Sequence, residues 1–504
     1  MCARDPRMAC LRTNPVRSSL RAALAALSLV CLVTAPALAQ AGGGVAWSQF
    51  QGGPAHLGTA PSAPLPPYRE RWRFESPDGP GSGPVVVGDT AIAVGEHAVY
   101  AVALETGDLV WQVARNGGPL SMPAVGTTGD RQVLVYLDGP LEDENASPST
   151  SPSPSASVAV SPSAGASPSV AGDGTAPVSD LVAIDLLDRV EVWRTGLQDT
   201  GRSGVAIDGD RAYVADDGGH VFAVELATGA VVWTAQALGR VDAPPAVADG
   251  SVYVVSRDPD QQKAQVLALD AETGERRWSF TPPSGAVAVS AASVADGTVV
   301  FGAADRLVRG LVSTDGAVRW DALSLTLFSP ASGPAIRSGA VAVADASAGV
   351  YDIDPRDGSR KWDHQMNDLV VRSSPVFVGS YVLIGLNDGR LVAFDADTGD
   401  LVFETAASKG LIGQIALTPN LIVAPKGGLS RPGLIAFEHD PEGALVRIPS
   451  PTVPDLGRLL GGFAVAFLIA GAAILVPFRL LRARIAPAFI REEDEDMNAG
   501  PEEP

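Results

Sequence analysis

The sequence predicts an all-β fold, a β-propeller of four-stranded blades, and two observations carry this prediction. An eleven-residue phrase that ends in an aromatic side chain recurs along the chain. Between Trp47 and Pro449, short strands rich in Val and Ile alternate with Gly and Asp, with no helical periodicity. Short strands grouped into one unit every 40 to 45 residues are typical of blades arranged around an axis.

The repeated phrase has eight versions. They are AVALETGDLVW (101–111), AIDLLDRVEVW (183–193), AVELATGAVVW (223–233), ALDAETGERRW (268–278), GLVSTDGAVRW (310–320), DIDPRDGSRKW (352–362), AFDADTGDLVF (393–403) and the degenerate AFEHDPEGALVR (436–447). The last version lacks its Trp, whereas Trp72 stands 39 residues before Trp111. We therefore expect the N-terminal strand around Trp72 to complete the last blade and close a ring of eight blades, with seven as the alternative.

The residue types of the phrase have a physical reason. The hairpin between the last two strands of a blade needs positive φ, which the glycines of Thr-Gly supply. The aromatic side chain has a large apolar face to bury, and a small residue at the start of the phrase leaves room for an indole from the neighbouring blade. The predicted docking residues are Trp72, Trp111, Trp193, Trp233, Trp278, Trp320, Trp362, Phe403, Gly107, Gly229, Gly274 and Gly399.

One insertion interrupts the repeat. The gap between Trp111 and Trp193 is 82 residues, and residues 144–178 fill it with Ser, Pro and Ala. Such a composition cannot form a core, so we expect a disordered loop that projects from the second blade. O-glycosylation of its Ser/Thr-Pro tracts and an unmodified spacer both remain open.

The N-terminal residues 1–39 have the pattern of a secretory signal. Arg12, Arg17 and Arg21 precede an apolar run over 22–33, and Ala37-Leu38-Ala39 provides a small-x-small cleavage site. An N-terminal membrane anchor is the alternative. All three cysteines of the chain lie within 1–39, so the expected mature chain contains no disulfide, no Cys-ligated metal and no haem attachment site.

The C-terminal part predicts a membrane anchor. Residues 459–478 carry no charge, match the thickness of a bilayer core, and are followed by Arg479, Arg482 and Arg484. We expect a propeller ectodomain over 40–449, a linker over 450–458, a transmembrane helix over 459–478 and an acidic cytoplasmic tail over 479–504. The formal net charge of −20 argues against a nucleic-acid partner.

The phrase A-x-D-x-x-T-G-x-x-x-W resembles the tryptophan-docking motif of pyrroloquinoline-quinone-type propeller repeats. The segment WSQFQGGPAHLG (47–58) resembles the start of the same repeats. This family includes the quinoprotein alcohol dehydrogenases and the BamB-like outer-membrane assembly lipoproteins. The resemblance covers about residues 47–447 and implies a fold more than an activity. The chain departs from the motif at Phe403, at Asp352 and in the eighth unit.

The resemblance raises the alternative of a quinoprotein dehydrogenase dependent on pyrroloquinoline quinone and Ca²⁺. The large members of that group carry a vicinal disulfide, which the mature chain cannot form. Acidic turns at Asp216-Asp217, from Asp258 and at Asn387 could be imagined as Ca²⁺ ligands, but they stand where hairpin turns are expected. The histidines His56, His97, His220, His364 and His439 are too scattered for a metal cluster.

The favoured prediction is a non-catalytic, BamB-like scaffold that is anchored to the cell membrane and exposes its propeller outside the cytoplasm. We predict no catalytic residue, no metal site and no resident cofactor, and we expect an envelope protein as partner. A single-pass anchor differs from the lipid anchor of BamB-type proteins and puts an outer-membrane assembly role in question. A glycan-binding propeller is a second alternative to the quinoprotein.

Overall fold

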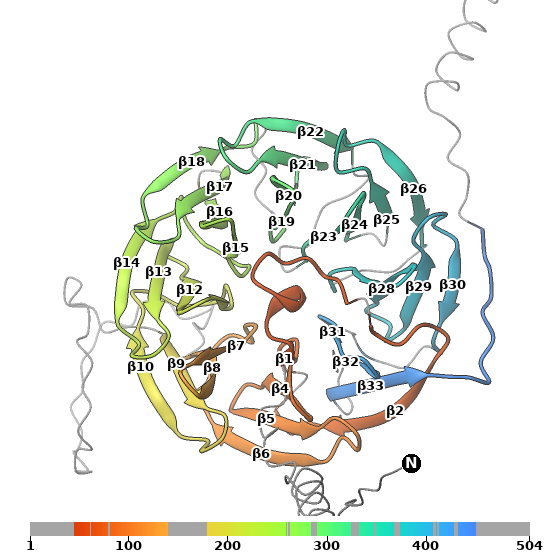
Figure 1. Cartoon of the computed structure of the whole chain (residues 1–504), viewed down its shortest axis with the longest axis horizontal. Helices are drawn as coiled ribbons and strands as arrows, with labels where there is room; N and C mark the ends of the chain where they lie inside the picture. The colour runs from red at the N-terminus through yellow and green to blue at the C-terminus, as the bar shows by residue number, and fades with distance from the viewer. Residues whose placement is uncertain are drawn as a thin grey trace, which may run out of the picture.

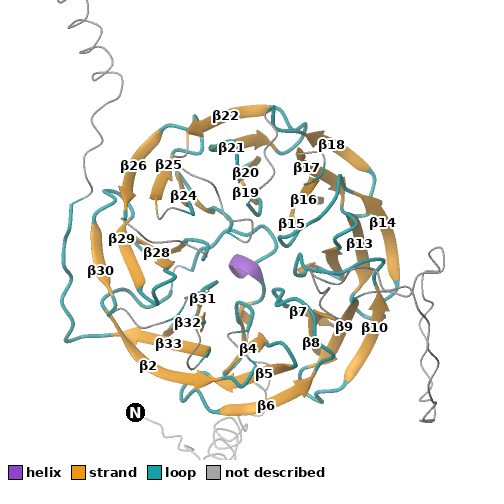
Figure 2. Cartoon of the chain, turned by 180° about the vertical axis from the view of Figure 1, so that it is seen from behind, coloured by secondary structure: helices purple, strands orange, loops and turns teal. Residues whose placement is uncertain are grey.

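The described residues of the computed structural model form a ring of eight β-sheets around a central axis, which Figures 1 and 2 show from opposite sides. These residues are 45–60, 62–78, 81–139, 179–258, 260, 263–283, 290–323, 332–346, 349–366, 373–406, 410, 413–427 and 432–449. The predicted signal, insertion, linker, transmembrane helix and cytoplasmic tail lie outside them. The described residues contain no helix that is long and apolar enough to cross a membrane.

The first four blades follow each other along the chain, and each strand pairs antiparallel with the next. Blade 1 contains β1 (Val45–Trp47), β3 (Val85–Val87), β4 (Thr90–Val94), β5 (Ala98–Ala103) and β6 (Leu109–Ala114). Blade 2 contains β7 (Ala124–Thr128), β8 (Arg131–Asp138), β9 (Asp180–Asp185) and β10 (Glu191–Gly196). Blade 3 contains β11 (Ala206–Asp208), β12 (Arg211–Ala215), β13 (His220–Glu225) and β14 (Val231–Gln236). Blade 4 contains β15 (Ala246–Ala248), β16 (Ser251–Asp258), β17 (Lys263–Asp270) and β18 (Arg276–Phe280).

The remaining blades continue this pattern. Blade 5 contains β19 (Ser293–Ala295), β20 (Thr298–Ala303), β21 (Leu307–Val312) and β22 (Val318–Leu323). Blade 6 contains β23 (Ala335–Arg337), β24 (Ala340–Ala344), β25 (Gly349–Ile353) and β26 (Arg360–Gln365). Blade 7 contains β27 (Val376–Val378), β28 (Tyr381–Gly385), β29 (Leu391–Asp395) and β30 (Leu401–Glu404). Blade 8 contains β31 (Ala416–Leu417), β32 (Leu421–Lys426), β33 (Gly433–His439) and, outermost, β2 (Tyr68–Glu75).

The ring closes as the sequence predicts. The N-terminal strand β2 pairs antiparallel with the C-terminal strand β33, with Trp72 opposite Ala436. The two ends of the propeller are therefore held in one sheet, as Figure 1 shows. The prediction of eight blades is confirmed, and the seven-blade alternative is wrong.

The hydrophobic core lies between neighbouring sheets, because each blade buries both faces of its middle strands. One cluster joins Val133 and Leu181 of blade 2 to Ile207 and Phe222 of blade 3. Burying a side chain of this kind contributes about 1.5–3 kcal/mol. The outermost strands face solvent on one side, and β14 alternates between buried and exposed positions accordingly.

The N-terminal segment 47–60 lies at the centre of the ring. It forms a short 3₁₀ helix over Phe50–Gly52 and hydrogen-bonds to the inner strands of six blades. Its backbone carbonyls at Ser48, Pro54, Ala55, Leu57 and Gly58 accept from amides of blades 2, 4, 5, 6 and 7, over 2.7–2.9 Å. The Gln49 side chain bonds both the amide and the carbonyl of Ile207 in blade 3. Figure 2 shows the small helix on the axis.

The connections divide the propeller into two faces. The face that carries the turns between first and second strands also carries the turn between third and fourth strands, which we call the docking turn. The docking turns are residues 104–108, 186–190, 226–230, 271–275, 313–317, 354–359 and 396–400 for blades 1 to 7. Blade 8 has no such connection, because its fourth strand β2 comes from the N-terminal side, and residues 440–443 form a turn after β33 instead. The opposite face, which we call the loop face, carries the longer connections between blades and the turns between second and third strands.

Candidate functional site

Six of the predicted docking aromatics lie against a glycine of the following blade. The pairs are Trp72 with Gly107, Trp193 with Gly229, Trp233 with Gly274, Trp278 with Gly316, Trp320 with Gly358 and Trp362 with Gly399. Each glycine has φ between +72° and +75°, and a Cβ atom there would lie 2.5–2.9 Å from the tryptophan side chain. Each indole N–H donates to a carbonyl of the same docking turn over 2.5–3.1 Å. These contacts hold consecutive blades together.

The small residue at the start of the phrase has a different neighbour from the one we expected. Ala101 lies opposite Trp111, Ala268 opposite Trp278 and Gly310 opposite Trp320, each across the third and fourth strands of one blade. The small residue therefore makes room for the indole of its own blade, and the expectation of a neighbouring indole is wrong. At Asp352, opposite Trp362, burial raises the pKa of the carboxyl to about 6 despite Lys361 at 3.6 Å.

The junction between blades 7 and 8 departs from this pattern. Phe403 replaces the tryptophan and contacts Tyr68 edge to face, with ring centroids 5.4 Å apart. The chain after β33 then runs along the outer edge of β30. Val446 N–H donates to Val402 O over 2.9 Å, and Leu401 and Ile448 exchange hydrogen bonds of 3.0 and 2.8 Å. A C-terminal segment of the chain itself thus covers this blade edge.

The junction between blades 1 and 2 departs in another way. The docking turn of blade 2 has Arg189 where the others have glycine, and Arg189 keeps the positive φ, at 60°. Its amide donates to Asp185 O over 2.8 Å, as Gly274 N–H does to Asp270 O over 2.9 Å, so the turn itself is retained. Arg189 carries the Cβ that a seated indole does not tolerate. Trp111 is accordingly only half-buried, and its N–H finds no acceptor among the described residues.

A groove of about 490 Å³ lies at this open junction on the docking-turn side. Its lining includes Val110, Trp111, Arg131, Leu187 and Arg189. A smaller groove of about 360 Å³ lies between blades 8 and 1, beside Leu104 and Glu105. In that second groove the neighbouring indole, Trp72, is seated and buried. Among the described tryptophans that close a blade, Trp111 alone lines an open groove without being docked.

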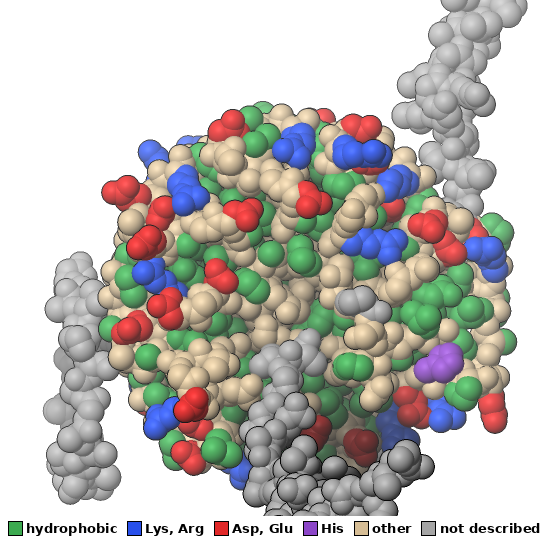
Figure 3. All heavy atoms as spheres, viewed as in Figure 1, with side chains coloured by type: hydrophobic (Ala, Val, Ile, Leu, Met, Phe, Trp, Pro, Cys, Tyr) green, Lys and Arg blue, Asp and Glu red, His purple; other side chains and the backbone are tan. Residues whose placement is uncertain are grey.

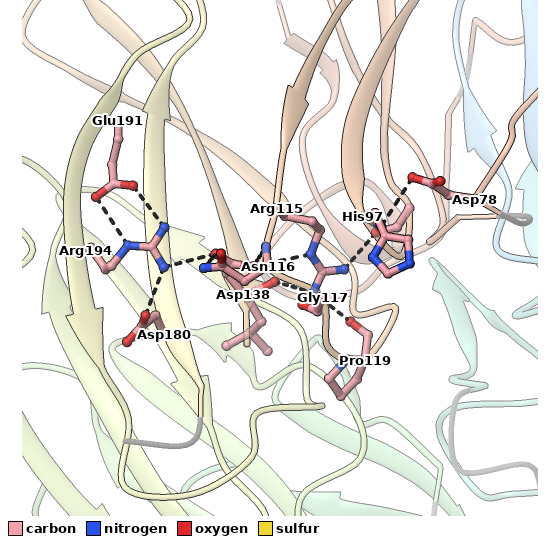
Figure 4. A network of polar contacts seen from close by, with 12 residues as sticks. Asp78, His97, Arg115, Asn116, Gly117, Pro119, Asp138, Asp180, Glu191 and Arg194 are labelled. Atoms are coloured by element: carbon pink, nitrogen blue, oxygen red, sulfur yellow. Dashed lines mark hydrogen bonds and ion pairs between the residues drawn. The ribbon is translucent and has the colours of Figure 1, made fainter. Parts of the chain in front are cut away.

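On the loop face, a buried ion cluster holds blades 1 and 2 together, as Figure 4 shows. The Asp138 carboxylate accepts from Asn116 N and Nδ2 over 2.8 and 2.9 Å and from Arg194 over 3.0 Å. Arg115 Nε lies 3.7 Å from the same carboxylate, and the Arg115 side chain is fully buried. Arg115 also donates to the carbonyls of Gly95 and Leu137 over 2.8 and 2.9 Å. Burial lowers the pKa of Arg115.

A second charge network runs along the loop face of blades 3 and 4. Asp217 pairs with Arg202 at 2.7 Å and with Arg240 at 3.7 Å, and Arg240 pairs with Asp242 at 2.6 Å. Asp242 is also bonded by Arg257. Alternating signs leave each carboxylate beside a guanidinium. Figure 3 shows acidic and basic side chains interspersed around the rim of one face.

The acidic residues that we weighed as Ca²⁺ ligands are engaged in the turns. Asp216 accepts from His220 N at 2.8 Å and contacts His220 Nδ1 at 3.0 Å, while Asp217 faces two arginines. Asp258 accepts from Asp260 N over 3.0 Å, and Asp388 beside Asn387 pairs with Arg390 at 2.7 Å. The described part of the chain brings no three His, Cys, Asp or Glu side chains together in a metal-binding arrangement.

The five histidines outside 1–39 lie apart. His97 is exposed on the loop face, His364 bonds the Gly399 carbonyl at 3.2 Å, and His439 bonds the Leu65 carbonyl at 2.8 Å. His56 is fully buried in the axial segment, where its Nδ1–H donates to Ala292 O over 2.8 Å. Burial lowers the pKa of His56 to about 4.

Comparison with known proteins agrees with this architecture. A family model described as outer membrane protein assembly factor BamB matches residues 178–326 and 322–419. The BamB protein of Bordetella pertussis is 31% identical over 161 residues, which are 31% of this chain and 40% of that protein. The chain spans less than two thirds of the length of the curated relatives that it matches.

Solved structures show the same fold. The crystal structure of BamB from Moraxella catarrhalis gives a TM-score of 0.52 at 17% identity, over 74% of this chain and all of that one. The quinohemoprotein alcohol dehydrogenase ADHIIG from Pseudomonas putida HK5 gives 0.58 at 13% identity, over 81% and 82%. The repeat, the blades and the family match support a PQQ-like β-propeller for this chain, with similarity to BamB over part of its length.

Sequence reasoning missed four features of the site, namely two of the docking glycines, the axial segment, the segment after β33 and the open junction. It did not single out Gly316 and Gly358, although both stand at the glycine position of their phrases. It did not place the axial segment 47–60 or the segment after β33 that runs along the edge of β30. The open junction had a signal in the sequence, because the phrase 183–193 has Asp188-Arg189 where the others have Thr-Gly, Asp-Gly or, in the eighth unit, Glu-Gly.

Proposed function

We propose that this chain is a non-catalytic protein-interaction scaffold of the cell envelope. Its propeller lies outside the cytoplasm, a single transmembrane helix over 459–478 anchors it, and it uses no resident cofactor. The matches to BamB proteins, which are named outer membrane protein assembly factors, support an assembly-type role. The acidic and basic side chains interspersed in Figure 3 favour a protein partner over a polyanion.

The proposal rests mainly on one observation, namely that the axial segment 47–60 lies at the centre of the ring and bonds to the surrounding blades. The buried side chains of Phe50, Gln51 and His56 lie on the axis, and their chain segment bonds to six blades. The centre of the ring therefore serves to join the blades. The surfaces left for recognition are the two faces and the blade edges, which suit macromolecules more than a small buried substrate.

The alternative of a quinoprotein dehydrogenase rests on a shared fold with enzymes of that class. The donor set of the described residues does not fit a Ca²⁺-bound quinone. A Ca²⁺ site needs carboxylate oxygens that are free to bind the cation, whereas the carboxylates of Asp217 and Asp242 are paired with arginines.

Two measurements on the full-length protein in detergent test the proposal. The first titrates pyrroloquinoline quinone with Ca²⁺ and follows cofactor absorbance and the melting temperature. A specific ligand raises the melting temperature by mass action, and we expect no change. Stoichiometric absorbance with a raised melting temperature would favour the dehydrogenase and overturn the proposal.

The second measurement places a photo-crosslinking amino acid at exposed positions of both faces in cells. We expect discrete crosslinks to one envelope protein from neighbouring positions, and none from positions on the opposite side of the ring. Crosslinks that are absent or spread over the whole surface contradict a scaffold with a defined partner. Protease access to the propeller in intact spheroplasts tests its location outside the cytoplasm.

A further inference from the structure

The open junction between blades 1 and 2 exposes apolar side chains next to its groove. Leu109 and Val110 of β6 are each 46% exposed, and Val190 is 55% exposed. Leu187, at 84%, is the most exposed large apolar side chain of the described part of the chain. Val110 and the half-buried Trp111 of blade 1 and Leu187 of the blade 2 docking turn line the groove itself, so both of its walls carry apolar side chains. Exposed apolar patches on soluble proteins often mark sites of interaction with other proteins.

The chain itself shows how a blade edge of this kind is covered. Leu401 and Val402 of blade 7 stand at the same positions of the repeat as Leu109 and Val110 of blade 1. They are only 7% and 5% exposed, because the segment through Val446 and Ile448 pairs with the edge of β30. The edge of β6 pairs with no further strand among the described residues. An added strand at β6 would bury the same two positions.

Arg189 supplies the second recognition feature of the groove, whose lining otherwise contains the Arg131–Asp185 pair and Asp130. Arg189 is exposed on the rim and makes no ion pair with a described residue, in a chain whose net charge is −20. Arg131, also on the rim, is 65% exposed and lies 3.8 Å from the Asp185 carboxylate. A carboxylate brought to this rim meets a free guanidinium at Arg189. Arginine suits such a contact because its planar fork pairs with a carboxylate through two hydrogen bonds.

We propose that the groove between blades 1 and 2 docks an extended segment of a partner protein. The segment adds a strand to the edge of β6, inserts a bulky apolar side chain beside Trp111 and places a carboxylate at Arg189. Strand addition supplies affinity through backbone hydrogen bonds, and the groove and Arg189 supply specificity. The inference rests on the proposed scaffold function and names the surface that this function uses.

Arg189→Gly is the sharpest variant for this inference. Glycine at 189 removes the Cβ that keeps the indole out, so Trp111 can seat as Trp233 does under Gly274. The variant also removes the guanidinium. It closes the groove without unfolding the blade, since six junctions of this propeller already have that geometry. A substitution that only damaged the fold would lower stability together with binding. We expect Arg189→Gly to lose binding and to keep its stability.

Val110→Ser and Val232→Ser form a matched pair. Val110 and Val232 each precede the closing tryptophan, and they are 46% and 45% exposed. Trp233 beside Val232 is seated and bonded to Ala271 O, whereas Trp111 beside Val110 is not. The first substitution touches the proposed site, and the second controls for a polar change at the same place in the repeat.

The experiment screens the full-length protein in detergent against a phage-displayed library of random nine-residue peptides, with depletion on Arg189→Gly. Enriched peptides are synthesised, labelled and titrated by fluorescence anisotropy. We expect an apolar residue and an acidic residue at fixed spacing. We expect binding at least tenfold weaker to Arg189→Gly and several-fold weaker to Val110→Ser, and unchanged binding to Val232→Ser.

Three outcomes overturn the inference. One is the absence of peptides that distinguish the wild type from Arg189→Gly. Another is equal weakening by Val110→Ser and Val232→Ser. The third is self-association of the wild type that Arg189→Gly abolishes, which assigns the groove to a second copy. If the crosslinking experiment still identifies a partner on another surface, the scaffold function stands and this docking site fails.

Discussion

Gly274 packs against the indole of Trp233 so closely that a Cβ at residue 274 would lie 2.6 Å from indole Cδ2. The same turn accepts the indole N–H at the Ala271 carbonyl, 3.1 Å away. One glycine thus serves two purposes, a left-handed turn and a seat for the tryptophan of the preceding blade. The repeat requires glycine here for both reasons.

Gly274→Ala tests this relationship. We expect the free energy of unfolding to fall by about 2–4 kcal/mol, from overpacking against Trp233 together with a non-glycine residue at φ +75°. Urea denaturation of the full-length protein measures it. Gly209→Ala is the control, because Gly209 has φ +59° with no atom within 4 Å of its Cβ position, so only the backbone cost of about 1 kcal/mol applies. Equal losses in the two variants contradict the seating argument.

Arg189→Gly is expected to stabilise the protein. It removes a non-glycine residue at φ 60° and lets Trp111 bury against the turn, which together are worth about 1–2 kcal/mol. Fluorine NMR of 5-fluorotryptophan-labelled protein follows the indole directly, with the Trp111 resonance assigned by Trp111→Phe. The solvent-induced isotope shift of that resonance should shrink in the variant. An unchanged shift together with lower stability means that another contact keeps Trp111 outside its seat.

The blades could be predicted from the sequence because the residues that determine each blade lie close together along the chain. Glycine in the docking turn and the closing tryptophan recur at fixed spacing, and the spare Trp72 with the incomplete eighth unit required a closure between the chain ends. The axial path of Trp47 to Ala60 and the path of the segment through Val446 along β30 could not be predicted this way. Their partners are backbone groups of distant blades, which leave no pattern of side chains along the chain.

The buried His56 predicts a pH dependence of stability. Its pKa falls from the ordinary 6.5 to about 4 on folding, so between these values the unfolded chain binds one proton more than the folded one. Stability therefore rises with pH across this window, and the contribution is complete above pH 6.5. On acidification to pH 4 about 3 kcal/mol is lost, at about 1.4 kcal/mol per pH unit.

His56→Asn isolates this contribution, since asparagine does not titrate and tolerates the positive φ of 57° at this position. Urea midpoints of the two proteins at pH 7.5, 6, 5 and 4.5 give the difference. We expect the wild type to lose its advantage over the variant as the pH falls. Parallel pH profiles would falsify the assignment of this window to His56.

Asp138→Asn tests how blades 1 and 2 remain joined where the tryptophan contact is missing. The carboxylate is 1% exposed and lies between Arg194 at 3.0 Å and the fully buried Arg115 at 3.7 Å, so its neutralisation leaves a buried guanidinium without its counter-charge. Removing one partner of a buried pair costs about 3–5 kcal/mol, whereas an exposed pair is worth less than about 1 kcal/mol. Asp180→Asn is the matched control, because Asp180 contacts the same Arg194 at 2.9 Å but is 29% exposed. Hydrogen exchange of the β6 and β10 amides should rise in Asp138→Asn and stay unchanged in Asp180→Asn. If both variants match the wild type, the junction is held by core packing between Val99 and Tyr136 instead.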